Sequence, residues 1–534
     1  MKLLAITGCT LLILAVAGFG AFAQSDAEYT GFESLFEEYR EFQGQTRGGG
    51  AASDYTPDKM EQEYRELKSF QKRLADIESS GWTISNQINY HLARAEMNGL
   101  EFRHKVTKPW ALDPGFYNDI LPRVGRRQRL PLSDEGLKRL RTRLQELPVF
   151  FEQAKKNLQP LSNVAAGLGT VAVLSLGDSR ESYVSLAAQA AELQPELVPD
   201  AEKALGEIDG YIDWINANKS KMTAKAGVGK ENYNWLMKNV YLFPYTWDDI
   251  RTIVELEDNR VITFLKLEQN RNRDVPPLIP AATQEEYKQK VIEAIEHTVG
   301  WIKENEIFTV HDYFEWKDYW QSGWHGFDTP WPEKHDYFFN FSHREPVMEE
   351  MHEMVAHSWD GQRTRRDPRP NRGGRLPYKI STARGEGYAF ALEELMVHAG
   401  ILDGRNPHGR EVAYEQAAFR TVRALSDIYM HSQEWSYEDA YKFCVENAPH
   451  GELLDGSHHL WYELDTTLRG VGHHMLMVVG KVQFMKLIRD RAQQLGDEFT
   501  LKRFMDEFYA TGTIPMALTR WELTGYDDEI KKLW

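Results

Sequence analysis

Apolar side chains recur along most of this 534-residue chain at the three- and four-residue spacing of an α-helix. The clearest series are Ile84, Ile88, Leu92 and Ala95, and Leu137, Leu140, Leu144 and Leu147. The same period continues through 178–218, 246–270 and 283–305. This spacing places the apolar residues on one helix face, which is then buried against neighbouring helices. Alternating, strand-like runs are scarce, and "LGTVAVLSL" at 168–176 is the main ambiguous one. We therefore expect a mostly α-helical protein.

The first 23 residues have the pattern of a secretory signal. Lys2 precedes a long apolar run, and Ala21-Phe22-Ala23 ends the run with the small-x-small pattern of a cleavage site. We predict a cleaved signal peptide and an exported protein, periplasmic or secreted. Two alternatives remain open. The run is long enough for an uncleaved membrane anchor, and "ITGC", ending at Cys9, resembles a lipoprotein cleavage box.

The chain is predicted to have four regions. They are a signal peptide (1–23), an N-terminal helix with a flexible linker (24–59), an N-terminal helical region (60–305) and a C-terminal helical region (306–534). The linker is indicated by "GQTRGGGAAS" at 44–53, because glycine and small polar residues favour flexible chain. Most of the 17 histidines lie within 311–474, so we expect the functional site in the last region.

The charge of the chain limits its partners. The formal net charge is −17, which argues against nucleic-acid binding and against adhesion to anionic lipid. We expect no stable membrane insertion after the signal is removed. The basic segment "RTRRDPRPNRGGR" at 363–375 is short, and we expect it to form a loop. Cleavage would leave Cys444 as the single cysteine, so no intramolecular disulfide is expected.

The segment "MHEMVAHSWDG" at 351–361 contains a His-Glu pair five residues before a second histidine. A hydrolytic zinc site needs three protein ligands, an open position for water and a carboxylate that takes the proton of that water. His352 and His357 are the candidate ligands, and Glu353 is the candidate base. On a regular helix, residues five apart differ by about 140° around the axis, so both imidazoles cannot face one ion. A π-bulge would restore a shared face, and so would a helix that ends near Ala356.

A second helix, predicted at 384–400 and ended by Gly400, supplies carboxylates. Glu386 and Glu393 lie seven residues apart on a face that also carries Phe390 and Val397. Carboxylates on an otherwise apolar face are costly unless they are paired or bind a metal. We therefore predict Glu386 as the third metal ligand. Glu393 is predicted to contact a ligand from behind, with a plain salt bridge as the alternative.

A third helix, predicted at 419–435, carries charges of both signs on one face. Its residues Arg420, Arg423, Asp427 and His431 follow one another at spacings of three and four. One interpretation is that His431 stabilises a tetrahedral oxyanion while Asp427 orients its ring and Arg423 supports the network. The other is a purely structural polar network.

Together these segments resemble the bacterial domain-of-unknown-function 885 family, whose members are regarded as helical zinc-metallopeptidase relatives. The family's HExxPGHH, EGWALYAE and RAxRxxxDxGxHxxxW motifs have counterparts in "HEMVAHSW", "EGYAFALEE" and "RTVRALSDIYMHSQEW", and the tail at 480–518 is also similar. The resemblance implies a large helical metallopeptidase-like fold with a deep central cleft. It further implies metal ligation by His352 and Glu386, a base at Glu353, and a polar pair at Asp427 and His431.

The chain departs from the family pattern at two places. "AHSW" replaces the Pro-Gly-His-His part of the first motif, so His357 aligns with a family histidine only if one residue is dropped. The family's Arg-Tyr pair and PGQALxY are replaced by "TTLRGVGHHMLMVVGK" at 466–481. A tyrosine that helps to polarise the scissile carbonyl in related peptidases is thereby lost, and one missing donor costs roughly a hundredfold in rate or more. His473 and His474 are the candidate substitutes.

These observations predict an exported peptidase, and the family resemblance implies that it acts on short peptides. Its predicted parts are one zinc ion on His352, His357 and Glu386, a base at Glu353, and oxyanion stabilisation by His431 with His473 or His474. The alternative is a non-catalytic relative that binds a peptide or a partner protein.

The aromatic run at 313–332 has two interpretations: its rings cap the core beside the site, or some of them line a substrate cleft. A helical glycosidase that uses this run would need two opposed carboxylates at a set separation. The sequence indicates no such pair.

Overall fold

The computed structural model describes residues 28–44, 52–124, 130–325, 337–373, 380–449 and 452–534. Within these ranges the chain is helical and has no β-strand, apart from a single parallel bridge between Ala165 and Ala224. The prediction of a mostly α-helical fold is confirmed. The predicted signal peptide and most of the predicted linker lie outside the described residues. No helix in the described ranges is long and apolar enough to cross a membrane.

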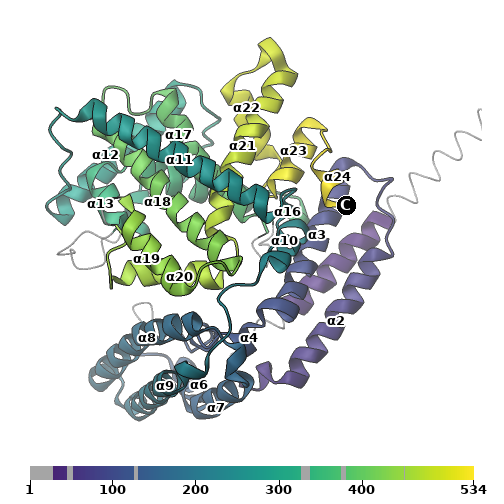
Figure 1. Ribbon diagram of the computed structural model, residues 1–534, viewed down its shortest axis with the longest axis vertical. Coiled ribbons are helices and arrows are strands. Elements are labelled where there is room, and N and C mark those ends of the chain that lie inside the picture. Colours follow the sequence, from purple (N-terminus) through teal and green to yellow (C-terminus); the bar gives the residue numbers. More distant parts are fainter. Residues whose placement is uncertain (1–27, 45–51, 125–129, 326–336, 374–379, 450–451) are drawn as a thin grey trace, which may run out of the picture.

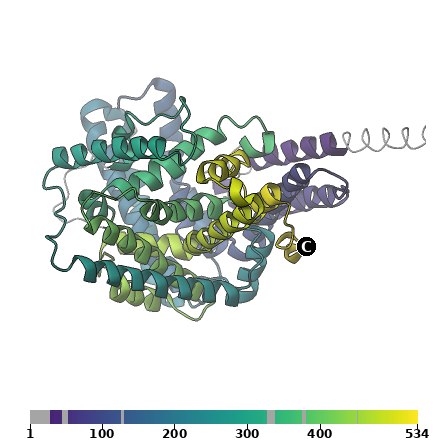
Figure 2. The same ribbon diagram turned by 90° about the horizontal axis from the view of Figure 1, so that it is seen from above.

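Three long helices form one side of the molecule, drawn in purple (Figure 1 and Figure 2). They are the helix at 28–44, α2 (Pro57–Ala75) and α3 (Ile84–Phe102). Thr83 caps α3 by accepting a hydrogen bond from the Asn86 N–H. The chain's end joins this layer, because Trp534 stacks on His91 of α3 with ring centroids 3.8 Å apart.

A second group of helices lies at one end of the molecule, at the bottom of Figure 1. It contains α4 (Pro109–Leu112), α5 (Phe116–Asp119), α6 (Asp134–Gln145), α7 (Leu147–Asn157), α8 (Ala166–Leu193) and α9 (Val198–Asn218). Ser133 caps α6 by accepting a hydrogen bond from the Gly136 N–H. The ambiguous run at 168–176 is helical and lies within α8, where Val171 and Leu176 are fully buried.

The remaining helices form the largest group. They are α10 (Lys230–Asn239), α11 (Trp247–Asn272), α12 (Gln284–Glu304), α13 (Tyr337–Arg344), α14 (Val347–Glu350), a π-helix (Met351–Ser358), α15 (Trp359–Thr364), α16 (Pro370–Gly373), α17 (Thr382–Ala399), α18 (His408–His431), α19 (Tyr437–Asn447), α20 (His458–Arg469), α21 (His473–Leu495), α22 (Leu501–Ala510), α23 (Met516–Thr524) and α24 (Ile530–Leu533). Helix α18 is the most enclosed, because every residue from Val412 to Ile428 is buried. Its charged side chains must therefore find partners inside the protein.

The described part of the aromatic run packs against the core of this group. Phe314 stacks on Trp359 of α15 with ring centroids 4.6 Å apart. Trp316, Tyr319 and Trp320 are partly buried against the same core. These contacts favour the interpretation that the rings cap the core. Residues 326–332 of the run lie outside the described residues.

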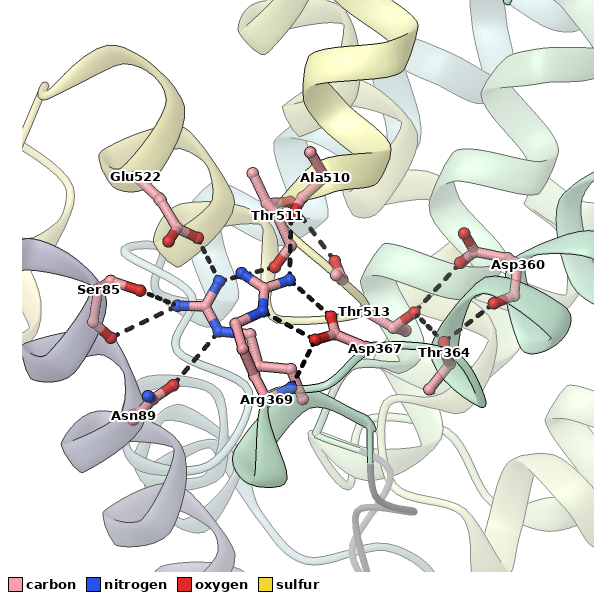
Figure 3. Close-up of polar contacts among 12 residues, drawn as sticks. Ser85, Asn89, Asp360, Thr364, Asp367, Arg369, Ala510, Thr511, Thr513 and Glu522 are labelled. Atoms are coloured by element: carbon pink, nitrogen blue, oxygen red, sulfur yellow. Dashed lines mark hydrogen bonds and ion pairs between the residues drawn. The ribbon is translucent and has the colours of Figure 1, made fainter. Parts of the chain in front are cut away.

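The basic segment at 363–375 was expected to be a loop, which holds for 365–369 but is wrong for the rest of its described residues. Residues 363–364 end α15, and 370–373 form the short helix α16, whose Arg372 side chain is fully buried. The Arg372 guanidinium lies between three parts of the chain, whose residues Ser85, Asn89, Thr511 and Glu522 are labelled in Figure 3. It donates to Ser85 and Asn89 of α3 and to the Thr511 carbonyl, and it pairs with Glu522 of α23. The segment's charge thus serves to join the N- and C-terminal helices.

A second buried ion network joins α11, α17 and α21. Lys481, which is fully buried, pairs with Glu394 and lies 2.6 Å from Glu257. Arg260 also donates to both carboxylates, with distances of 2.6 Å to Glu394 and 2.7 Å to Glu257. Burial raises the pKa of Glu394, but Arg260 and Lys481 outweigh it and lower the pKa to about 2.

The depressed pKa of Glu394 predicts a specific loss of stability in acid. The ion pairs stabilise the fold fully above about pH 4.5, and this contribution is lost as the pH falls towards 2. A shift of this size corresponds to about 3 kcal/mol. We expect the free energy of unfolding, measured by urea denaturation at several pH values, to fall across this window. Glu394→Gln should be less stable at pH 7 and should show a weaker pH dependence; an unchanged dependence would contradict the assignment.

Candidate metal centre

The segment that contains His352, Glu353 and His357 forms a π-helix, Met351–Ser358. A π-helical distortion was one of the two arrangements expected to place both imidazoles on one face. Met351, Met354 and Val355 are fully buried in the core and hold this helix in place. Because a π-helix bonds residues five apart, His352 and His357 lie on one face. Their Nε2 atoms are 3.1 Å apart.

Glu386 joins these two histidines from the first turns of α17. Its Oε2 atom lies 3.6 Å from His357 Nε2 and 3.8 Å from His352 Nε2. One ligand atom from each of the three residues falls within 4.8 Å of the others. Two imidazole nitrogens and a carboxylate oxygen are a donor set that zinc takes, and ligand atoms about 2.0–2.1 Å from a tetrahedral ion are about 3.3 Å apart. The three residues therefore fit a zinc ion.

The charges of this cluster are strongly coupled. Burial lowers the pKa of His357, but the Glu386 carboxylate outweighs this effect and raises it to about 9. Burial raises the pKa of Glu386, but the imidazole of His357 outweighs it and holds the pKa well below its usual range. His352 and His473 act on Glu386 in the same direction as His357. The side chains of His357 and Glu386 are 29% and 26% exposed, so water can reach the cluster.

Glu393 contacts His352, one of the three candidate ligands. Its Oε1 atom accepts a hydrogen bond from His352 Nδ1 at 2.5 Å. Arg420 of α18 donates to both Glu393 oxygens, at 2.7 and 3.0 Å. The carboxylate orients the ring so that His352 Nε2 faces His357, an arrangement also found in carboxylate–histidine–zinc sites.

Arg423 was predicted to support the polar network of Asp427 and His431, and its ion pair is with Glu463. Arg423 lies one helical turn further along α18 than Arg420 and donates to Glu463 of α20 at 2.7 Å. Arg420 completes the network of Glu393 and His352. The sequence placed it on the polar face of its helix but assigned it no partner. The signal for Arg420 was its spacing of three residues from Arg423. Glu463 carried no sequence signal.

Glu353 lies beside the three candidate ligands. Its Oε1 atom is 3.9 Å from His352 Nε2, and its side chain is 18% exposed. The carboxylate is therefore near the histidine nitrogens and reachable by water, which is the position a base needs.

Asp427 and His431 are placed differently from the sequence interpretation. Asp427 is fully buried and accepts hydrogen bonds from the backbone N–H groups of Gly472, His474 and Met475 at the start of α21. The His431 ring bonds the Thr467 carbonyl through Nε2, 3.9 Å from Asp427. Asp427 thus fixes the N-terminus of α21 and does not orient His431 by a hydrogen bond.

The two histidines at the start of α21 differ in burial. His474 is 1% exposed, and its Nε2 lies 3.4 Å from Glu463. His473 is partly exposed and close enough to Glu386 to act on its pKa. Of the three histidines predicted to stabilise an oxyanion, His473 is the one that is partly exposed, whereas His431 and His474 are buried.

Two glycines set the distance between α17 and α21 and thereby the position of Glu386. A Cβ added at Gly387 would overlap the backbone of Gly480, and one added at Gly480 would overlap the Ala383 carbonyl. The helices therefore cross with their backbones in contact. Glu386 is the residue before Gly387, so the contact fixes the position of Glu386 relative to the two histidines.

Gly387→Ala is expected to lower the free energy of unfolding by about 1–3 kcal/mol, because the extra methyl group forces the two backbones apart. Gly385→Ala in the same helix is the matched control, since a Cβ there meets nothing within 4 Å. The control should be neutral or stabilising, because alanine favours helix over glycine by up to about 1 kcal/mol. Thermal and urea denaturation would measure both. Equal effects of the two substitutions would contradict the close crossing.

Comparisons with known proteins agree with this picture at the level of fold. The chain resembles a solved structure from Shewanella oneidensis, provisionally described as a lipoprotein of unknown function, with a TM-score of 0.67 and 16% identity over 88% of this chain and 92% of that one. A protein from Colwellia psychrerythraea with a similar description gives a TM-score of 0.58 and 14% identity, covering 95% and 99% of the two chains. No curated protein matches the chain. Residues 351–523, which contain the whole candidate metal centre, match the model of the family described as bacterial protein of unknown function (DUF885).

Proposed function

We propose that this protein is an exported zinc-dependent peptidase that hydrolyses short peptides. The observation that carries the proposal is the convergence of His352, His357 and Glu386, whose ligand atoms lie within 4.8 Å of one another. Glu353 lies at the edge of this cluster. A closed structural zinc site has four protein ligands, whereas three ligands, access for water and an adjacent carboxylate are typical of a catalytic one.

Each residue has a role that follows from its position. His352, His357 and Glu386 would hold the ion, and Glu393 with Arg420 orients His352. When bound, zinc supplies a Lewis acid that makes hydrolysis by water feasible at neutral pH.

Proton transfer is assigned to Glu353 and charge stabilisation to His473. The Glu353 carboxylate accepts a proton from the attacking water and returns it to the amine that leaves. His473, at the start of α21, would donate a hydrogen bond to the oxygen of the scissile carbonyl as negative charge develops there.

A second candidate function is a protein that keeps this shell and binds peptides without cleaving them. It is favoured by the burial of His431 and His474, because two of the three candidate oxyanion donors are enclosed within the protein. The motif changes at 356–359 and 466–477 point in the same direction.

Export is proposed on two grounds. The first 23 residues have the pattern of a secretory signal, and both structural neighbours are provisionally described as lipoproteins. Those descriptions also favour lipid attachment at Cys9 as an alternative to cleavage after Ala23. Mass spectrometry of the mature N-terminus distinguishes the two.

Elemental analysis of the purified mature protein tests the proposal. We expect about one zinc ion per wild-type chain and little in His352→Ala and Glu386→Ala. Digestion of a library of short synthetic peptides should then detect cleavage by the wild type alone. A wild type that takes up no zinc, even after reconstitution, would overturn the metal centre. Zinc uptake without cleavage would favour the binding protein.

A further inference from the structure

A cavity of about 640 Å³ lies where the N-terminal helices meet the turn between α20 and α21. Its lining comes from both sides: from Gly99 to Asp119 around the end of α3, and from Asp465 to His473. The volume is in the range of small-molecule and peptide pockets.

Helix α21 connects this cavity to the candidate metal centre. Its first residue, His473, lines the cavity, and Gly480 further along the helix packs against Gly387, the neighbour of Glu386. Gly470 and Val471, in the turn just before α21, also line the cavity. A molecule in the cavity would therefore contact the segment that carries the proposed oxyanion donor.

The cavity wall has an irregular backbone. A second π-helix, Arg103–Thr107, follows α3 and contributes Arg103, Val106 and Thr107 to the lining. It ends at Lys108, which has the left-handed φ of 34°. Both π-helical turns and left-handed non-glycine residues are enriched at functional sites. The cavity wall and the segment Met351–Ser358 therefore both contain a π-helix, which is rare in proteins.

Most of the wall is apolar and suits side chains of a peptide. The apolar lining residues include Phe102, Val106, Leu112, Phe116, Leu168 and Val240. A surface of this kind binds aliphatic or aromatic groups through burial of apolar area.

One corner of the cavity has an excess of negative charge. Arg469 lies among three carboxylates: 2.8 Å from Asp113, in contact with Asp119, and 3.5 Å from Asp465. Asp465 Oδ1 is buried and makes no hydrogen bond with the described residues. Burial raises the pKa of Asp465 to about 6 even though Arg469 acts against it.

Among the described residues, Asp465 forms its ion pair with Arg469 and none with Arg103 or Lys225, which also line the cavity. Arg103 faces the rings of Trp110 and Phe116, 5.9 and 5.8 Å from their centroids. Lys225 is exposed. The corner at Asp465 therefore offers carboxylate oxygen to a cationic group of a ligand.

We propose that this cavity binds the substrate of the proposed peptidase as a short peptide, with apolar side chains along its wall and a cationic group at Asp465. The inference rests on the proposed function for its link to catalysis. The cationic group is the N-terminal ammonium of the peptide or a lysine or arginine side chain, and both have the same chemistry.

Blocking the cavity in the folded protein tests its occupancy. Thr107→Cys introduces a thiol into the wall, which a bulky maleimide then fills. The native Cys444 is buried and protected. Val149, on α7, has an exposed side chain, so labelled Val149→Cys is the matched control. The probes are Leu-Ala-Leu-Ala, its N-acetyl form, and the N-acetyl forms of Lys-Ala-Leu-Ala and norleucine-Ala-Leu-Ala. Labelling at Thr107→Cys should raise KM, or Kd measured by calorimetry, by about tenfold or more, with zinc content unchanged.

The charge at Asp465 has a separate readout. In the wild type, we expect the free tetrapeptide to bind about tenfold or more tightly than its acetylated form, or the lysine peptide more tightly than the norleucine one. Asp465→Asn should remove whichever preference exists. The first preference identifies the N-terminal ammonium and the second the side chain. Absence of both preferences would overturn the cationic subsite.

The outcomes separate this inference from the proposed function. A wild type that cleaves these peptides but is unaffected by the label overturns the cavity assignment alone. A wild type that binds them without cleavage, and loses binding when labelled, retains the cavity and overturns the peptidase. Failure to bind or cleave any of the four peptides overturns the inference, while zinc analysis and the wider library still decide the proposed function.

Discussion

Glu353→Gln is expected to lower kcat for peptide hydrolysis roughly a hundred- to ten-thousand-fold, the range that general-base catalysis contributes. Glutamine keeps the size of the side chain but cannot accept a proton at neutral pH. Because Glu353 is 3.9 Å from His352 and is not among the three converging ligands, zinc content should stay near the wild-type value. Steady-state kinetics and elemental analysis on the same preparation measure the two effects.

Two comparisons give this result its meaning. Glu386→Gln should lose zinc and activity together, since Glu386 belongs to the ligand set. Glu285→Gln, at the exposed start of α12, should change neither. Full activity in Glu353→Gln would exclude Glu353 as the base. If the wild type shows no hydrolysis but both proteins bind the same peptides, the binding-protein alternative is correct.

Arg372→Met is expected to lower the free energy of unfolding by about 3–5 kcal/mol, as removal of one partner from a buried ion pair does. The guanidinium is fully buried, and its partners Ser85, Thr511 and Glu522 belong to separate parts of the chain. Methionine fills much of the space but leaves the Glu522 carboxylate and the Thr511 carbonyl without their donor. Urea denaturation followed by circular dichroism measures the change.

Arg369→Gln is the matched control for this experiment; Figure 3 shows Arg369 with its partner Asp367. Arg369 is 34% exposed and pairs with Asp367, two residues away in sequence. Exposed pairs contribute about 0–1 kcal/mol, so we expect a small effect. A loss below about 1 kcal/mol in Arg372→Met as well would contradict the bridging role of this arginine.

The sequence predicted those features that depend on local spacing. The helical period predicted α3, α6 and α11, and the five-residue spacing of two histidines required a distorted helix where the π-helix is found. The contact between Glu393 and His352 followed from the cost of a carboxylate on an apolar face.

The misassigned residues depend on contacts between helices. Arg420 and Arg423 share one helix face, yet the first binds Glu393 and the second binds Glu463. Helical spacing gives the face but not which neighbouring helix lies opposite each turn. Asp427 was assigned to a histidine on its own helix, whereas it binds backbone N–H groups of α21, which no side-chain pattern reveals.

Arg372 was missed for a related reason. A run of arginines with proline and glycine is typical of a solvated loop. Its burial depends on Glu522, 150 residues further along the chain, and on Ser85, 287 residues before it. Separations of this size carry no local signal in a single sequence.

The contact between Gly387 and Gly480 has a consequence for how the centre can move. Helices whose backbones touch cannot slide past each other without a clash, and Lys481 locks the next position by its ion pairs with α11 and α17. The scaffold of the candidate centre is therefore stiff, whereas the His357 and Glu386 side chains remain partly open to solvent. If these residues bind an ion, the spacing of α17 and α21 should be the same with and without it.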